Sequence, residues 1–248
     1  MTFKSRLCAG ELTIGTFQKT PSAMICEVFG RSGLDVICLD AEHSPFDRGD
    51  INECVLALRA VGKPSLVRIA ANRAEHILNA LDCGADGVLV PHVTTGDDAE
   101  AVVANAHFVT GRGYAGSTRA AGYGARSMAE HKRLSADATV TIAQIEDAEA
   151  LDHLDAIFSV SAIDAFFIGR ADLSVSLNAD GPNDAAVIEA VQMICAKGRE
   201  AGVTIGMFTG DLGELPDWRA RGASLFLLGS DHSLMLAGAA DLVARART

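Results

Sequence analysis

Short apolar runs recur along the chain, and each is followed by a longer stretch with the apolar spacing of an amphipathic helix. Runs that are apolar nearly throughout are typical of parallel strands whose outer faces are covered by helices. The pattern predicts strands at Leu12–Phe17, Asp35–Leu39, Ser65–Ile69, Gly87–Val90, Val140–Ile145, Ala165–Ile168, Val203–Met207 and Leu225–Leu228. Helices are expected between them, for example at Ile51–Val61, Ala74–Cys83, Asp97–Phe108 and Ala185–Ala201, with a last one at Ser233–Ala244.

Glycines mark the expected ends of several helices. A glycine just before the next strand is typical of the left-handed cap that a tight turn from helix to strand requires. Repeated units of strand then helix favour a closed (β/α)8 barrel, a TIM barrel, with an open doubly wound sheet as the alternative. The 248 residues match the roughly 250 of one such barrel, so we expect a single domain over residues 1–248. The glycines concerned are Gly33, Gly62, Gly84, Gly202 and Gly222.

Charge and cysteine usage narrow the classes of function. The net charge is −11 and no Lys or Arg run is long enough to form a basic stripe, which argues against a nucleic-acid partner. The six cysteines form no CxxC pair, as expected for the reduced thiols of a cytoplasmic protein. No apolar run approaches the roughly 20 residues of a membrane span, and residues 1–15 lack the apolar core of a signal peptide. We therefore expect a cytoplasmic protein with no membrane partner.

Polar residues follow several of the predicted strands, at the end of the barrel where active sites lie. Taken singly, a His after a strand is usually a satisfied structural residue, and an Arg within a strand can be paired to a neighbour. A charged residue facing a packed barrel nevertheless needs a partner or a role. The convergence of these polar residues on one rim of the barrel predicts an active site. The segments are Asp40-Ala41-Glu42-His43, Arg68, Pro91-His92, Gln144-Ile145-Glu146 and Gly169-Arg170-Ala171-Asp172-Leu173-Ser174.

Two of these carboxylates, Glu146 and Asp172, end adjacent predicted strands, so their side chains can meet above the barrel. Two close carboxylates repel each other unless a proton or a cation lies between them. Oxygen ligands with open positions suit a hard divalent ion such as Mg²⁺ or Mn²⁺. A pair that shares a proton for acid–base chemistry is the competing interpretation.

Four of the motifs resemble, in order and spacing, the HpcH/HpaI aldolase family: Asp40-Ala41-Glu42-His43, Arg68, Gln144-Ile145-Glu146 and the segment from Phe167 to Ser174. Its members are class II pyruvate aldolases, such as 4-hydroxy-2-oxoheptanedioate aldolase. The similarity runs from about Gly15 to Ser230, nearly the whole chain, and the motifs are specific together although each is weak alone. The resemblance implies reversible cleavage of 4-hydroxy-2-oxo acids to pyruvate and an aldehyde through a metal-stabilised pyruvate enolate. It also implies a homo-oligomer, commonly a hexamer, and a place in aromatic-compound catabolism.

The resemblance further implies a metal and a pyruvate site. Glu146 and Asp172 would hold Mg²⁺, Mn²⁺ or Co²⁺, and no organic cofactor is expected. Pyruvate would chelate the ion through its keto and carboxylate oxygens. Gln144 and the backbone around Ala171 and Asp172 would help to bind it.

The resemblance assigns catalytic roles as well. Arg68 would lie against the keto oxygen, His43 would be the base, and Asp82 would raise the basicity of that histidine. These assignments suit the chemistry, because a histidine titrates near neutral pH and fixed positive charge stabilises an enolate. One departure is visible, since Arg170 stands where the family commonly has Pro. Arg170 is expected either to pair with a nearby carboxylate or to meet an acidic group on the substrate.

Other features leave alternatives open. The Gly-rich segment from Gly111 to Arg119 lacks the Lys-Ser/Thr ending of a phosphate loop and is expected either to cover the substrate or to be structural. Arg119 and Tyr123 are candidates for contacts with the distal part of the substrate, Arg119 with a distal carboxylate. Of the lysines, only Lys19 follows a strand end, so it is the candidate for a Schiff-base mechanism. The rival functions are a lyase for citramalyl- or malyl-CoA and a catalytically inactive barrel that serves as a binding module.

Overall fold

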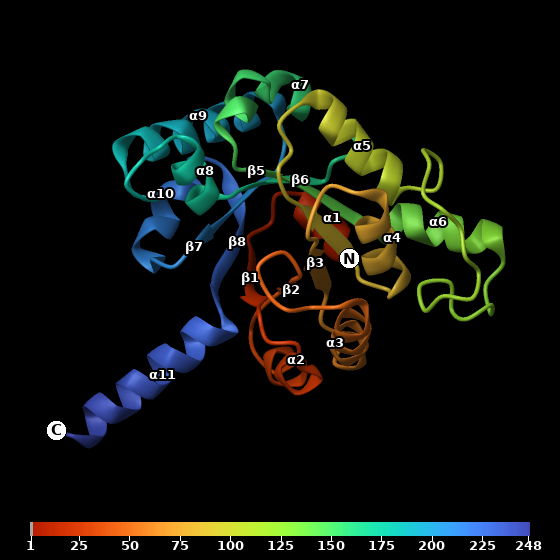
Figure 1. The fold of residues 1–248 in the computed structure, drawn as a ribbon, viewed down its shortest axis with the longest axis horizontal. Helices are drawn as coiled ribbons and strands as arrows, with labels where there is room; N and C mark the ends of the chain where they lie inside the picture. Colours follow the sequence, from red (N-terminus) through yellow and green to blue (C-terminus); the bar gives the residue numbers. More distant parts are fainter. Residues whose placement is uncertain (1) are drawn as a thin grey trace.

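The eight strands form one closed, wholly parallel barrel in the computed structural model, which describes residues 2–248 (Figure 1). The strand order follows the chain, which confirms the predicted (β/α)8 barrel and excludes the open sheet. Strand limits differ from the expected ones by a few residues, most at the last two strands. The strands are β1 (Thr13–Gln18), β2 (Val36–Asp40), β3 (Ser65–Arg68), β4 (Gly87–Val90), β5 (Val140–Ile145), β6 (Ala165–Ile168), β7 (Ile205–Thr209) and β8 (Ala223–Ser230).

Helices surround the barrel, and the expected ones are present with small changes at their ends. The segment between α5 and α6 contains neither helix nor strand, as its Gly-rich composition predicted. The helices are α1 (Phe3–Cys8), α2 (Ala23–Gly30), α3 (Arg48–Ala60), α4 (Ala74–Asp82), α5 (Gly96–Ala106), α6 (Met128–Ala138), η1 (Ala148–Asp152), α7 (Leu154–Phe158), α8 (Arg170–Ser176), α9 (Ala185–Ala201), η2 (Leu212–Glu214), α10 (Leu215–Ala220) and α11 (Asp231–Ala246).

Four of the five predicted glycine caps adopt the left-handed conformation. At Gly202, which follows α9, φ is +69°, and the residue's N–H bonds back to the helix. Gly62, Gly84 and Gly222 also have positive φ. The prediction for Gly33 is wrong, because α2 already ends at Gly30 and is capped by Arg31 in the ordinary right-handed region.

The barrel interior is filled by alternate residues of the strands, as the two-residue period of a strand requires. Leu7 of α1 joins this cluster with no exposed surface, and its carbonyl accepts a hydrogen bond from Thr204 Oγ1, just before β7. Helix α1 therefore closes the barrel at the N-terminal ends of the strands, and the opposite end remains for a site. The interior residues are Phe17, Val36, Cys38, Leu66, Leu89, Val140, Ile142, Ala165, Phe167, Leu225 and Leu227.

The last helix, α11, extends away from the barrel instead of packing against it (Figure 1). The helix predicted at Ser233–Ala244 is therefore confirmed, and it begins two residues earlier. Only Asp231, at its start, is buried. Its exposed large apolar residues are Leu234, Met235, Leu236, Leu242 and Val243. Within residues 2–248, the structure has no helix with the length and apolar character needed to cross a membrane.

Candidate active site

The inward alternation of the strands carries polar residues to the open rim of the barrel. Val36 and Cys38 face the interior and Asp40 continues their face at the end of β2. Arg68 continues the face of Leu66 on β3 in the same way. Gln144 and Glu146 continue the interior face of β5. The sequence motifs that predicted a site are thus the top layer of the barrel interior.

Asp40 and Arg68 are neighbours across β2 and β3 and form a buried ion pair. Arg68 Nε donates to Asp40 Oδ1 at 3.0 Å, and Arg68 Nη2 lies 2.8 Å from Asp40 Oδ2. The guanidinium also lies over the ring of Phe17, 4.5 Å from its centroid. Burial raises the pKa of Asp40, but the bonds from Arg68 outweigh it and the pKa is lower than usual. Both groups are therefore charged, and Arg68 is held in one orientation.

Glu42 and His43 follow β2 and lie beside this pair. Arg68 Nε is 3.3 Å from Glu42 Oε2, and His43 Nε2 is 3.6 Å from the same oxygen. Burial raises the pKa of Glu42 to about 7, although Arg68 lowers it. Burial and the charge of Arg68 lower the pKa of His43 below 6.5. His43 is therefore neutral at pH 7 and can accept a proton, and half of its side chain is exposed at the rim.

Glu146 is fully buried at the end of β5, where the fold makes room for it. It accepts a hydrogen bond from Gln144 Nε2 and one from the backbone N–H of His92 at 2.9 Å. Gly169 packs against it, because a Cβ there would lie 2.5 Å from Glu146 Oε2 and 2.8 Å from its Cβ. Burial raises the pKa of Glu146, although the bond from Gln144 lowers it. No Arg or Lys pairs with this carboxylate among residues 2–248, so its charge lacks a permanent counter-ion.

Asp172, in the first turn of α8, lies near the same group of carboxylates. Burial is the largest influence that raises the pKa of Glu146, and the negative charge of Asp172 raises it further. It also opposes the lowering of the pKa of His43. Within residues 2–248, Asp172 forms no ion pair. The charge of Asp172 thus acts on both Glu146 and His43, and the metal site expected at Glu146 and Asp172 stays a prediction.

Glu42 and His92 belong to this group, although the sequence analysis gave them no role of their own. One ligand atom from each of Glu42, His92 and Glu146 lies within 4.8 Å of the others, a spacing that can hold a metal ion. His92 has a φ of +55°, which is uncommon outside glycine, and its Nδ1 lies 3.0 Å from Asp147 Oδ2. Each is the second residue after a strand, Glu42 after β2 and His92 after β4, and that position was the available signal.

Lys19 also reaches the rim. It follows β1, and its Nζ lies 3.2 Å from Asp40 Oδ2 with about a third of the side chain exposed. Its backbone N–H donates to Asp231 Oδ1 at 2.8 Å. The candidate for a Schiff-base lysine is therefore in the neighbourhood of Asp40 and Arg68, where it is paired to a carboxylate.

Asp82 does not join the site within one chain. It lies at the C-terminal end of α4, which leads back to the start of β4, and Arg112 Nη2 donates to it at 2.9 Å. His43 instead lies beside Glu42, with its Nε2 3.6 Å from Glu42 Oε2, and its backbone N–H donates to Asp40 Oδ1 at 3.2 Å.

Arg119 and Arg170 are likewise bonded to other residues of the protein. Arg119 Nη2 donates to Asn52 Oδ1 at 2.8 Å, and Tyr123 lies near its guanidinium. Arg170 is buried and pairs with Glu214 at 2.5 Å. Its other bonds go to Pro182 O and Asn183 Oδ1, and it lies 5.5 Å from the ring of Trp218. Of the two roles expected for Arg170, the structure shows the pairing with a carboxylate.

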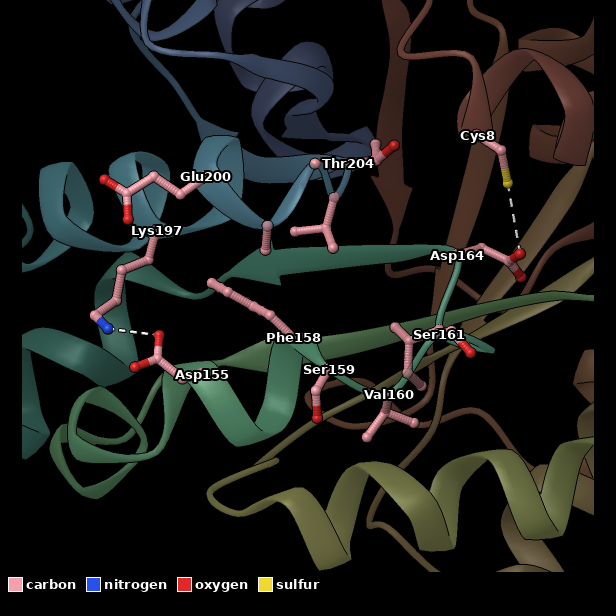
Figure 2. Close-up of a pocket in the computed structure, with 14 residues that line it drawn as sticks. Cys8, Asp155, Phe158, Ser159, Val160, Ser161, Asp164, Lys197, Glu200 and Thr204 are labelled. Carbon is pink, nitrogen blue, oxygen red and sulfur yellow. Dashed lines mark hydrogen bonds and ion pairs between the residues drawn. The ribbon is translucent and has the colours of Figure 1, made fainter.

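A cavity of about 710 Å³ lies elsewhere, near the N-terminal ends of β6 and β7 (Figure 2). Asp164 and Thr204, which directly precede these strands, are among its lining residues. Lys197 of α9 also lines the cavity and pairs with Asp155 of α7 at 2.5 Å (Figure 2). Barrel enzymes work at the other end of their strands, so this cavity is not the active site.

The fold and this rim define a barrel of the aldolase type, and the comparisons with known proteins agree. The model of the HpcH/HpaI aldolase/citrate lyase family matches residues 13–237, so the chain belongs to this family. It is 31% identical over 242 residues to a hydroxypyruvate/pyruvate aldolase of Paraburkholderia phytofirmans, covering 94% of this chain and 92% of that protein. It is 33% identical over 242 residues to a 2-keto-3-deoxy-L-rhamnonate aldolase of Shigella dysenteriae, covering 94% and 88%.

A solved structure agrees over the whole fold. An HpcH/HpaI aldolase/citrate lyase family protein from Burkholderia cenocepacia superposes with a TM-score of 0.93 at 30% identity. The match covers 99% of this chain and 98% of that one. The resemblance that the motifs predicted is confirmed, and so is the barrel on which it depends.

Proposed function

We propose that this protein is a divalent-metal-dependent pyruvate aldolase that reversibly cleaves 4-hydroxy-2-oxo acids to pyruvate and an aldehyde. The observation that carries the proposal is the composition of the rim. The buried carboxylate of Glu146, which has no Arg or Lys partner among residues 2–248, shares the rim with a fixed guanidinium and a histidine that is neutral at pH 7. Retro-aldol cleavage needs a base for the C4 hydroxyl and positive charge for the enolate.

Glu146 and Asp172 would hold the metal ion, as predicted from the sequence. The donors fit a hard cation, because burial and neighbouring carboxylates disfavour the charged form of Glu146, and a cation would relieve this cost. Glu42 fits less well as a ligand because its carboxylate faces Arg68. His92 is more than half exposed and offers a softer nitrogen donor. When bound, the ion would polarise the keto oxygen of pyruvate and offset the negative charge that develops there.

Arg68 would orient pyruvate and stabilise its enolate. Its bonds to Asp40 fix the guanidinium before the substrate arrives, so little reorganisation is needed as charge develops. Gln144 Oε1 is buried without a hydrogen-bond partner among residues 2–248, so it can accept a bond from a water molecule or a substrate hydroxyl, whereas pyruvate itself offers only acceptors. The first turn of α8 leaves the N–H groups of Ala171 and Asp172 without helical partners, so they can bind the pyruvate carboxylate.

His43 would take the proton from the C4 hydroxyl of the substrate. Its lowered pKa keeps the imidazole unprotonated at pH 7, and its exposure at the rim lets it reach a substrate or a bridging water. In the synthetic direction the same residue would return the proton to the new alkoxide. Glu42, the nearest carboxylate at 3.6 Å, would stabilise the imidazolium.

Calorimetric titration with Mn²⁺ tests the ligand assignment. We expect Glu146→Gln and Asp172→Asn each to weaken binding about 100-fold or more, because each removes a charged oxygen ligand. His92→Ala should weaken binding less than either of them. Asp155→Asn, on α7 near the opposite end of the barrel, is the control for a lost surface carboxylate. Equal affinity in Asp172→Asn and wild type, with a large loss in His92→Ala, would assign the ion to Glu42, His92 and Glu146 instead.

We also propose a homo-oligomer, a hexamer by family resemblance, held together in part by α11. A projecting helix with large exposed apolar residues gains stability when another subunit covers it. Light scattering on the intact protein should give a hexamer, and Leu236→Asp should give smaller particles. Lys132→Glu, on the exposed face of α6, controls for the change of charge. A monomeric wild-type protein would contradict this proposal.

The six unpaired cysteines support a cytoplasmic location.

A further inference from the structure

Lys19 occupies a position in the barrel that the interior pattern defines. Gly15 and Phe17 face the interior of β1, so Lys19 is the next residue on that face, directly at the rim. The register of β1 with β2 pairs Gln18 with Leu39, which places Lys19 beside Asp40. The ion pair of 3.2 Å between them agrees with this position.

The rim has two halves with different chemistry. The half at β2 to β6 carries Asp40, Arg68 and Glu146, where pyruvate and the ion would lie. The other half is formed by the ends of β7, β8 and β1, and Lys19 follows β1. Phe208 faces the rim there beside Phe17, 6.1 Å between ring centroids, and is exposed. With pyruvate and the ion in the first half, as proposed above, the second half is the part of the rim left for the aldehyde.

Lys19 supplies a cation where the two halves meet, because β1 lies between β8 and β2. Phe208 and Gly210 at the end of β7, and Gly229 and Ser230 at the end of β8, are uncharged. The buried carboxylate of Asp231, which follows β8, is bonded to the backbone N–H groups of Lys19 and Thr20. Lys19 shares Asp40 with Arg68, which already approaches both oxygens of that carboxylate. An ammonium has three donors, so Lys19 can bind a second anion without losing the first.

The loop that carries Lys19 is fixed in place. The backbone N–H groups of Lys19 and Thr20 donate to the two oxygens of Asp231, at 2.8 and 3.0 Å. Asp231 is buried at the start of α11. Thr20 Oγ1 also contacts His232 Nε2 at 3.0 Å. A cation on a fixed loop is suited to selecting a substrate, because little order has to be gained on binding.

We propose that Lys19 determines specificity for the aldehyde component by binding an acidic group on it, such as a carboxylate. This inference rests on the proposed aldolase function. It replaces Arg119 and Arg170 in this role, because both guanidiniums are bonded to other parts of the protein. Lys19 contacts the substrate through its charge and takes no part in bond cleavage.

Matched acceptors test the proposal. Aldol addition of pyruvate to 4-oxobutanoate is compared with addition to butanal, which carries a methyl group in place of the carboxylate. Lys19→Met should lower kcat/KM for 4-oxobutanoate about tenfold or more relative to butanal, mainly through KM. Lys19→Arg should restore most of the preference for the acid, and Lys19→Gln should not. Lys197→Met, on α9 outside the site, should keep the wild-type preference.

Other outcomes overturn the proposal. Equal losses for both acceptors in Lys19→Met and Lys19→Gln, or no change in their ratio, mean that Lys19 only supports Asp40. A borohydride-stable pyruvate adduct on Lys19 makes it a Schiff-base nucleophile instead. Exchange of the pyruvate methyl protons in D2O by the wild-type enzyme tests the aldolase function separately from the role of Lys19. Absence of metal-dependent exchange contradicts the aldolase function, whereas exchange with an unchanged acceptor ratio contradicts only the role of Lys19.

Discussion

Gly169→Ala tests whether the fold holds Glu146 where a metal ligand has to be. The new Cβ would lie 2.5 Å from Glu146 Oε2, 2.8 Å from Glu146 Cβ and 2.9 Å from Gln144 Nε2. Rotating the carboxylate removes the first contact but not the second, because a Cβ is fixed to the backbone. The end of β5 or β6 therefore has to shift, and Glu146 moves with it.

The expected cost follows from packing and from metal chemistry. Overpacking of this kind costs about 1–3 kcal/mol of folding free energy. Disturbing the support of a metal ligand weakens metal affinity about 10–100-fold, or about 1.4–2.8 kcal/mol. Thermal unfolding measures the first quantity and Mn²⁺ calorimetry the second. Gly181→Ala is the matched control, since no heavy atom lies within 4 Å of its added Cβ. If both variants bind Mn²⁺ equally well, Gly169 does not position the ligand and the reasoning is wrong.

Three further predictions follow from charged residues. The kcat/KM for cleavage should fall on acidification with a midpoint below pH 6.5, because protonated His43 cannot accept a proton and its pKa is lowered by burial and Arg68; a midpoint above 6.5 in the pH profile contradicts this. The metal-free protein should lose up to about 3 kcal/mol of stability as pH rises from 4.5 to about 7, because burial raises the pKa of Glu42 and the folded state holds its proton more tightly. Urea unfolding of Glu42→Gln should show less of this loss. Arg170→Met should destabilise the fold by about 3–5 kcal/mol, because it leaves Glu214 without its cationic partner and with only the bond from Trp218 Nε1, while the ratio of kcat/KM for acidic and neutral substrates stays unchanged.

The barrel and its polar rim could be predicted because both follow from local periodicity. The alternation that buries Val36 and Cys38 carries Asp40 to the rim, and the same rule holds from Leu66 to Arg68. The same alternation applies to Lys19, so its place on the interior face could be predicted from the sequence once the strand was assigned.

Other features depended on contacts between distant segments. No sequence pattern near Arg170 predicts its ion pair with Glu214, which lies at the end of η2. The position of Asp82 depends on the length of α4, which carries it away from the rim to Arg112. Helix α11 has a regular amphipathic pattern, but such a pattern does not specify whether the apolar face packs on its own barrel or on another subunit.

The central claim is that cleavage depends on a divalent ion. It is tested most directly by pyruvate release from 4-hydroxy-2-oxoheptanedioate, coupled to lactate dehydrogenase, after EDTA treatment and after adding back Mg²⁺, Mn²⁺ or Co²⁺. The proposed function predicts that release stops with EDTA and returns with metal in the wild-type protein but not in Glu146→Gln. Release that persists in EDTA, or a thioester such as malyl-CoA cleaved while no hydroxy-oxo acid is, would contradict it.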